Sequence, residues 1–322
     1  MITNPITKTV SADPYITYDE DTCFYYATYT ANEKVGKNDV SVLQISRSKT
    51  LCDVIDAEKI ILLRQGQGEH GYYYMWAPEM FKSSDGKWYV YCSGFLQNEI
   101  VWNNLKIFVL RSKTNNPFDG FEFVKEFTEL SGAFDATVYM HDNGKLYMCY
   151  TQTMYSFEYT THEQRLYIHE MISPIELSKK RAEISKADLP FELSVPTEKI
   201  NEGPFFINND GKVFIVYSAN GCNNFDYCLG LLEYKGGEIC NASSWLKHDQ
   251  PILYQSETLF GPGHASFFYI QNKKELWCAF HAIIDKNNST KLFRDRYACV
   301  NIVEFDEKGV PFIGKAKKTE IL

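Results

Sequence analysis

The chain has 322 residues, long enough for one large domain or two of ordinary size. Hydrophobic residues make up 44% and charged residues 23%, a composition that excludes a disordered or fibrous chain. The net charge of −8 argues against nucleic acid as a partner, because phosphate binding requires a basic surface. No stretch reaches the roughly 18 apolar residues of a membrane helix, so we expect no membrane association. A small, weakly charged substrate fits better.

Nine cysteines form no C-x-x-C pair, so the sequence indicates neither a disulfide framework nor a zinc ribbon. Most of them lie within apolar runs, where free cysteine behaves as a small hydrophobic residue. The first residues lack the basic and apolar regions of a signal peptide. We therefore predict a reducing compartment and a cytoplasmic location.

Short aromatic strands recur along the chain, and aromatic residues make up 15% of it. Three of these strands follow Asp-Gly or Asn-Gly turns, which favour tight hairpins. The five segments are residues 22–28, 87–92, 145–150, 212–217 and 275–280, aligned on Tyr25, Tyr89, Tyr147, Phe214 and Trp277. This repeat predicts an all-β fold, a five-bladed β-propeller formed by one domain over residues 1–322. A two-sheet sandwich is the alternative.

Charged residues precede each aromatic strand at a similar distance, 10 to 13 residues upstream. They are Asp13, Glu79, Asp135, Glu202 and His264. In equivalent blades these positions would meet around a central channel. Clustered carboxylates repel each other and lose solvation, so their convergence indicates a function. Glycoside hydrolysis uses such a set, with one carboxylic acid that protonates the leaving oxygen and one carboxylate that activates water.

The ordered motifs resemble those of glycoside hydrolase family 43. They are Ala12-Asp13-Pro14-Tyr15, Trp76-Ala77-Pro78-Glu79, Phe134-Asp135-Ala136, Asn201-Glu202-Gly203-Pro204 and Gly261-Pro262-Gly263-His264. The resemblance implies an inverting propeller enzyme, with Asp13 as general base and Glu202 as general acid. It also implies that Asp135 tunes the pKa of the acid and orients it.

Further residues are predicted at the substrate. Trp76 could form an apolar wall for the sugar ring, although a core role would explain it equally well. Arg296 matches a family arginine that hydrogen-bonds the sugar, with a surface ion pair to Asp295 as the alternative. The resemblance places His281 among the substrate-binding residues. It places His264 near a structural calcium ion on the propeller axis, and it implies no cofactor for catalysis.

The substrate class follows from the resemblance alone. Residues 166–174, and residues 217–221 followed by 227–232, are more similar to the α-L-arabinofuranosidase branches, so we expect release of arabinofuranosyl units from arabinan or arabinoxylan oligosaccharides. A β-D-xylosidase is the alternative within the family. A catalytically silent sugar-binding propeller and a protein-interaction propeller are alternatives from other classes. Exo or endo action, linkage preference and oligomeric state are left open.

Overall fold

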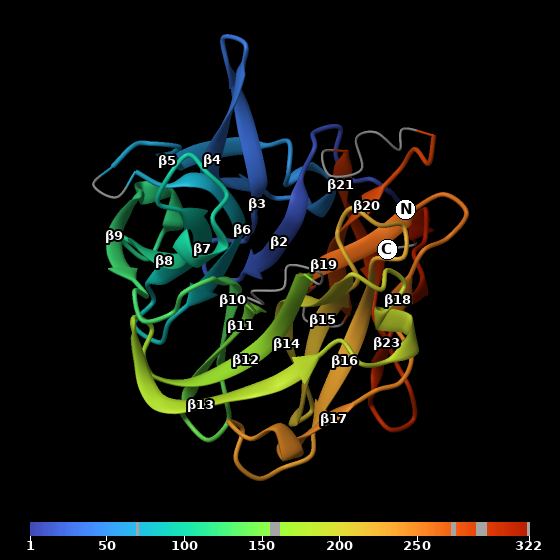
Figure 1. The fold of residues 1–322 in the computed structure, drawn as a ribbon. Helices are drawn as coiled ribbons and strands as arrows, with labels where there is room; N and C mark the ends of the chain where they lie inside the picture. Colours follow the sequence, from blue (N-terminus) through green and yellow to red (C-terminus); the bar gives the residue numbers. More distant parts are fainter. Residues whose placement is uncertain (69–70, 155–161, 272–274, 288–294, 321–322) are drawn as a thin grey trace.

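The computed structural model describes residues 1–68, 71–154, 162–271, 275–287 and 295–320. The described chain is built from β-strands and short 3₁₀ helices, as the aromatic strand pattern predicts. The strands nearest the centre are β2, β6, β10, β14 and β19, and the sheets fan outward from them (Figure 1). The 3₁₀ helices are η1 (Leu51–Asp53), η2 (Trp102–Asn104), η3 (Pro117–Asp119), η4 (Pro190–Glu192) and η5 (Ala242–Ser244).

Consecutive strands pair antiparallel within each group. The first group holds β2 (Ala12–Asp19), β3 (Phe24–Val35), β4 (Asn38–Ser48) and β5 (Glu58–Arg64). The second holds β6 (Tyr73–Lys82), β7 (Trp88–Phe95), β8 (Leu105–Ser112) and β9 (Phe121–Glu126). The third holds β10 (Ala133–Met140), β11 (Leu146–Met154), β12 (His162–Ser173) and β13 (Glu176–Lys186).

The remaining strands follow the same order. The fourth group holds β14 (Glu198–Asn209), β15 (Lys212–Ala219), β16 (Cys228–Tyr234) and β17 (Trp245–Lys247), and the fifth holds β19 (Phe260–Tyr269), β20 (Leu276–Ile283) and β21 (Arg296–Ile302). A short parallel pairing of β12 with β14 joins the third and fourth groups into one sheet. The short strands are β1 (Ile2–Thr3), β18 (Leu253–Tyr254), β22 (Glu304–Phe305), β23 (Pro311–Phe312), β24 (Gly314–Lys315) and β25 (Thr319–Glu320).

The hydrophobic core is divided among the spaces between neighbouring groups. One cluster joins Leu43 of the first group to Phe108 of the second. Another joins Ala27 of the first group to Ala279 and Val300 of the fifth, so the last group packs on the first. Aromatic side chains fill much of these interfaces, which accounts for the aromatic composition.

Each innermost strand carries a β-bulge at the same place. One residue of each bulge has a positive φ between 45° and 55°, a left-handed conformation. These five residues are Asp13, Ala77, Asp135, Gly203 and His264. A bulge bends the strand and re-aims a side chain, so it sets which way this position points.

The bulges are linked by a closed set of hydrogen bonds, which we call the inter-sheet ring. In each link, the backbone N–H of a bulge residue donates to a side chain on the second strand of the preceding group. The links are Ala77 to Thr30, Asp135 to Ser93, Gly203 to Thr151, His264 to Ser218 and Asp13 to His281, with lengths of 2.8, 3.0, 3.2, 2.8 and 3.1 Å. The last link returns from the first group to the fifth.

The strand register corrects the alignment made from the sequence. Glu79 lies two residues beyond the bulge residue Ala77, and Glu202 lies one residue before Gly203. The aromatic strand of the first group is also offset by one residue. In the other four groups, the aligned aromatic residue lies four residues before the side chain that accepts the bulge N–H. In the first group the acceptor is Thr30, and the residue four positions before it is Tyr26, not Tyr25. The acids are therefore not all equivalent positions: Asp13 and Asp135 are bulge residues, whereas Glu79 and Glu202 lie beside one.

The two ends of the chain meet beside the fifth group. Strand β1 pairs with β25, and the backbone N–H of Ile6 and Ser11 donate to β21. Asn4 is buried between these segments, where its side-chain amide donates to the carbonyls of Val300 (2.7 Å) and Lys317 (2.8 Å). Its side-chain oxygen accepts from the N–H of Val300 at 2.8 Å.

Replacing Asn4 by alanine should lower the free energy of unfolding by about 2–4 kcal/mol, because three buried hydrogen bonds are lost. Urea unfolding followed by tryptophan fluorescence would measure the change. Asn38→Ala, at the exposed tip of the β3–β4 hairpin, is the control and should shift it by no more than about 0.5 kcal/mol. Equal effects of the two variants would contradict this account of the closure.

Candidate active site

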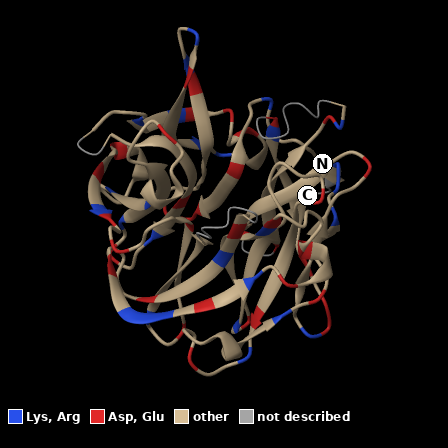
Figure 2. Ribbon diagram, viewed as in Figure 1, with Lys and Arg blue, Asp and Glu red and all other residues tan. Residues whose placement is uncertain are grey.

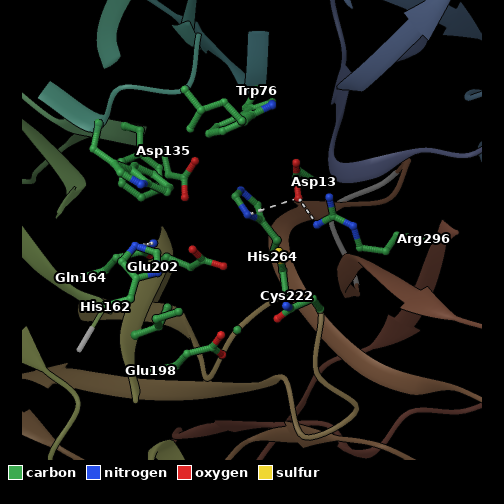
Figure 3. A pocket seen from close by; sticks show the side chains of 16 residues that line it. Asp13, Trp76, Asp135, His162, Gln164, Glu198, Glu202, Cys222, His264 and Arg296 are labelled. Carbon is green, nitrogen blue, oxygen red and sulfur yellow. Dashed lines mark hydrogen bonds and ion pairs between the residues drawn. The ribbon is translucent and has the colours of Figure 1, made fainter. Parts of the chain in front are cut away.

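A cavity of about 290 Å³ lies where the innermost strands converge (Figure 3). It is lined by most of the residues predicted from the sequence: Asp13, Trp76, Asp135, Glu202, His264 and Arg296. The structure therefore brings together three carboxyl groups that are spread over almost two hundred residues of chain.

Strand geometry places the side chains in this cavity. Asp13, Asp135 and His264 occupy bulge positions with positive φ, where a non-glycine residue costs about 1–3 kcal/mol. Gly203 occupies the fourth such position, where an added Cβ would lie 3.0 Å from His264. Strain of this kind is held only where surrounding contacts impose it, and here the inter-sheet ring does so.

Four polar groups surround the Asp13 carboxylate. Its carboxylate accepts from the Thr30 hydroxyl at 2.6 Å and from Arg296 at 3.3 Å, and it lies 3.4 Å from His264 and 3.2 Å from His281. Burial raises the pKa of Asp13, but His264 and Arg296 lower it more, so its pKa lies well below 3.8. Because burial lowers the pKa of His264 itself, the permanently charged Arg296 is the neighbour that keeps Asp13 ionised at neutral pH.

Glu202 has the opposite electrostatic environment. Burial raises its pKa to about 7, and the negative charges of Asp13 and Glu198 add to this effect. The Tyr227 hydroxyl donates to the carboxyl of Glu202 at 2.8 Å and opposes the rise. Two carboxyl groups in one cavity thus have pKa values on opposite sides of their ordinary range, an arrangement typical of an acid and a base.

Asp135 is the third buried carboxyl group that lines this cavity. Burial raises its pKa first, followed by the charges of Glu202, Asp13 and Glu79. Asp135 and Glu202 titrate as a pair, because ionising one makes ionisation of the other less favourable. The pair therefore retains a proton near neutral pH.

The surroundings of His264 do not match the donor set of calcium. Calcium takes six to eight oxygen ligands, whereas the side chain of His264 faces Asp13 and the backbone at Gly203. In the described part of the chain, no group of three or more His, Cys, Asp or Glu side chains could hold a metal ion. The axial calcium remains a prediction from resemblance, and no chemical step below uses it.

His281 lies behind Asp13 and not at the substrate. Its side chain is fully buried and does not line the cavity. Its ring Nδ1 accepts the backbone N–H of Asp13, and burial lowers its pKa to about 3. The predicted substrate contact does not fit this position, because Asp13 separates the imidazole from the cavity.

Several cavity residues were missed by the sequence analysis. Trp102, His162, Gln164, Glu198 and Cys222 all line the cavity. Trp102 extends the aromatic wall, with ring centroids 6.3 Å from Trp76 and 5.0 Å from His162. Glu198 lies four residues before Glu202, and Cys222 directly follows the segment 217–221; Trp102, His162 and Gln164 come from a 3₁₀ helix and a strand without a local signal.

Glu79 lies in a different cavity. This second cavity, of about 300 Å³, is lined by Glu79, Tyr15, Trp88 and Phe205 among others, and does not include Asp13 or Glu202. Burial raises the pKa of Glu79 well above 4.5. The expectation that Glu79 joins the other acids at one end of the channel is therefore wrong: Glu79 lies two residues beyond the bulge residue Ala77 and lines the second cavity.

Comparison with known proteins identifies the class. The model of the family "Glycosyl hydrolases family 43" matches residues 2–311. Together with the all-β propeller fold and the cavity of buried carboxyl groups, this match defines a glycosidase. The chain belongs to glycosyl hydrolase family 43.

Individual relatives are consistent with this assignment. An extracellular exo-alpha-(1->5)-L-arabinofuranosidase of Streptomyces avermitilis is 34% identical over 87% of this chain and 56% of its own length. A protein of the same name from Streptomyces chartreusis is 30% identical over 87% and 81%. The chain thus spans only about half the length of the first relative.

A solved structure shares the fold. The alpha-L-arabinofuranosidase from Lactobacillus brevis superposes with a TM-score of 0.82 at 24% identity, over 97% of this chain and 96% of that one. At this identity the likeness concerns the fold alone.

The predicted cytoplasmic location is contradicted by the relatives, because both Streptomyces proteins are named extracellular. The cysteine argument was not specific to a compartment, because it rested on cysteines within apolar runs. Cys92, Cys149, Cys228, Cys278 and Cys299 are free but buried, so packing protects them and their thiol state does not report the compartment.

The part of the chain that the structure describes contains no helix with the length and apolar character needed to span a membrane. Acidic and basic residues are interspersed over the sheets, with a basic stretch on β13 (Figure 2).

Gly263→Ala should disrupt the site, because the added Cβ would lie 2.2 Å from the ring of Tyr227. We expect a loss of about 1–3 kcal/mol in the free energy of unfolding and a large loss of glycosidase activity as Tyr227 moves. Gly144→Ala is the control: its Cβ meets open space, so only its positive φ adds a cost, and activity should persist. Full activity of Gly263→Ala would contradict the required position of Tyr227.

Proposed function

We propose that this protein is an inverting α-L-arabinofuranosidase that releases terminal arabinofuranosyl units from arabinan or arabinoxylan oligosaccharides. The single observation that supports it most is the opposed electrostatics of Asp13 and Glu202 in one aromatic-walled cavity. The names of the two Streptomyces relatives support both the sugar and the exo mode of action.

In this proposal Asp13 is the general base. Its lowered pKa keeps it ionised, so it can take a proton from the attacking water. Glu202 is the general acid, since a pKa of about 7 leaves much of it protonated at neutral pH. Inversion requires the two carboxyl groups to stand about 6.5–9.5 Å apart, with water between base and sugar. Asp135 is proposed to raise the pKa of Glu202 through the charge repulsion between the two carboxyl groups.

Trp76, Trp102 and Arg296 are proposed to bind the sugar. The two indole rings offer an apolar face, and the guanidinium group of Arg296 can donate to hydroxyl oxygens while it holds Asp13. Catalysis in this scheme requires no cofactor.

We further propose that the described strands form five blades of one domain. The five groups of consecutive strands, the core clusters between neighbours and the inter-sheet ring support this count. An arrangement of this kind gives each innermost strand one position at the central cavity.

The function is tested with nitrophenyl α-L-arabinofuranoside and nitrophenyl β-D-xylopyranoside. Preferential hydrolysis of the arabinofuranoside would support the proposal, and preference for the xyloside would indicate a xylosidase. Proton NMR of the first product should show the anomer of inverted configuration. Sugar binding without hydrolysis of either compound would indicate a silent sugar-binding protein and overturn the proposal.

Glu202→Gln should reduce kcat by about 10²–10⁴-fold on an arabino-oligosaccharide, because the leaving oxygen loses its proton donor. The loss should be much smaller with a nitrophenyl leaving group, which departs without protonation. Asp13→Asn should be severely impaired on both substrates, since water activation is needed in each. Similar losses on the two substrates for Glu202→Gln would argue against its role as acid.

The pH profile of kcat/KM should be bell-shaped. Activity should fall as the pH rises through about 7, where Glu202 loses its proton, and fall again in acid as Asp13 becomes protonated. Asp135→Asn removes one carboxyl group of the pair, so Glu202 should ionise more easily and the basic limb should move to lower pH. An unchanged basic limb would contradict the tuning role of Asp135.

A further inference from the structure

We propose that His281 and Tyr227 form a rigid spacer that positions the base Asp13 and the acid Glu202 relative to each other. This inference rests on the proposed roles of the two carboxyl groups. Neither His281 nor Tyr227 lines the cavity, so both are positioning residues that act through the groups they hold.

The spacer is a stack of two fully buried rings. The ring planes of Tyr227 and His281 lie 6° from parallel with centroids 5.5 Å apart. On one side, Nδ1 of His281 accepts the backbone N–H of Asp13 at 3.1 Å and lies 3.2 Å from the Asp13 carboxylate. On the other side, the Tyr227 hydroxyl donates to Glu202 at 2.8 Å. The stack therefore connects the base to the acid through two rings.

Tyr227 cannot easily move away from this position. Gly263 packs against its ring so closely that a Cβ would lie 2.2 Å from it. The loop before Tyr227 is fixed by Asn220, whose side-chain amide donates to the carbonyls of Phe191 and Asp226, each at 2.9 Å. The stack is thus held on several sides.

Comparison of the five links of the inter-sheet ring isolates what the imidazole adds. Four links use a serine or threonine hydroxyl as the acceptor, and only the link to Asp13 uses histidine. A hydroxyl suffices to receive a bulge N–H in this geometry. The imidazole at the fifth link therefore does more than accept the bulge N–H: it also supplies the flat stacking face for Tyr227.

An inverting mechanism gives this spacer a chemical purpose. The base and the acid act on opposite sides of the sugar, so the distance between them must admit one water molecule and one ring. A displacement of about 1 Å in such a site can cost about 100-fold in rate. The spacer fixes this distance without occupying the cavity.

The variant His281→Thr tests the proposal, because threonine can receive the Asp13 N–H as at the other links while the stack is removed. We expect kcat to fall by about 100-fold with little change in KM, equally on nitrophenyl arabinofuranoside and on an arabino-oligosaccharide. Circular dichroism and thermal melting verify the fold. Val54→Ala, a buried core variant away from the cavity, is the control for lost stability and should keep its kcat.

Tyr227→Phe tests the other half, since it keeps the ring but removes the hydrogen bond to Glu202. Its basic pH limb should move to higher pH, because that bond favours the ionised acid. The basic limb of His281→Thr should also move as Tyr227 loses its support, a change that a merely structural role would not produce. If His281→Thr does not fold, His281→Asn places a side-chain oxygen near Nδ1 and should show the same loss of kcat.

Wild-type kcat and pH profiles in both His281→Thr and Tyr227→Phe would overturn the spacer. That outcome would leave the proposed function intact as long as Asp13→Asn and Glu202→Gln are impaired. If those two variants keep full activity, the proposed function itself fails. The two failures are therefore separable with one set of four proteins.

Discussion

The inter-sheet ring is the interaction on which the site depends. A bulge residue with positive φ presents its N–H sideways, and a side chain of the preceding group receives it. Without that acceptor, a buried donor would lose its hydrogen bond and the strained conformation would lose its support. The same constraint that joins neighbouring groups therefore also aims Asp13 and Asp135 into the cavity.

The inter-sheet ring then allows one cavity to hold two carboxyl groups with different pKa values. Asp13 faces Arg296 and stays ionised, while Glu202 faces a tyrosine hydroxyl and other acids and keeps its proton longer. Burial strengthens both effects, since charges interact more strongly away from water. The fold thus separates an acid from a base by position, although both are carboxylic acids.

Much of this could be predicted from the sequence, for identifiable reasons. Aromatic strands after Asp-Gly and Asn-Gly turns marked the β structure, and family motifs marked Asp13, Asp135 and Glu202, which line the cavity together. The prediction was less accurate for Glu79. It was counted with the other acids because a spacing of 10 to 13 residues did not distinguish Glu79 from the bulge position two residues earlier, Ala77.

The surroundings of the acids could not be read from the sequence. Trp102 comes from a 3₁₀ helix between strands, and Tyr227 from a loop, so neither has a periodic pattern around it. His281 matched a family position, but its burial behind Asp13 depends on how the fifth group packs on the first. Contacts between segments that are distant in sequence decide whether a residue lines the cavity or lies behind it. A sequence motif gives information only about its own strand, so it cannot predict these contacts.

The link made by His281 lies at the junction where the two ends of the chain meet. Segments near both termini cover this seam, and the base is anchored to it. Hydrogen bonds of these terminal segments hold the seam together, so we expect it to loosen early on heating. Heat inactivation should thus begin with a misplaced Asp13, while most sheets are still folded.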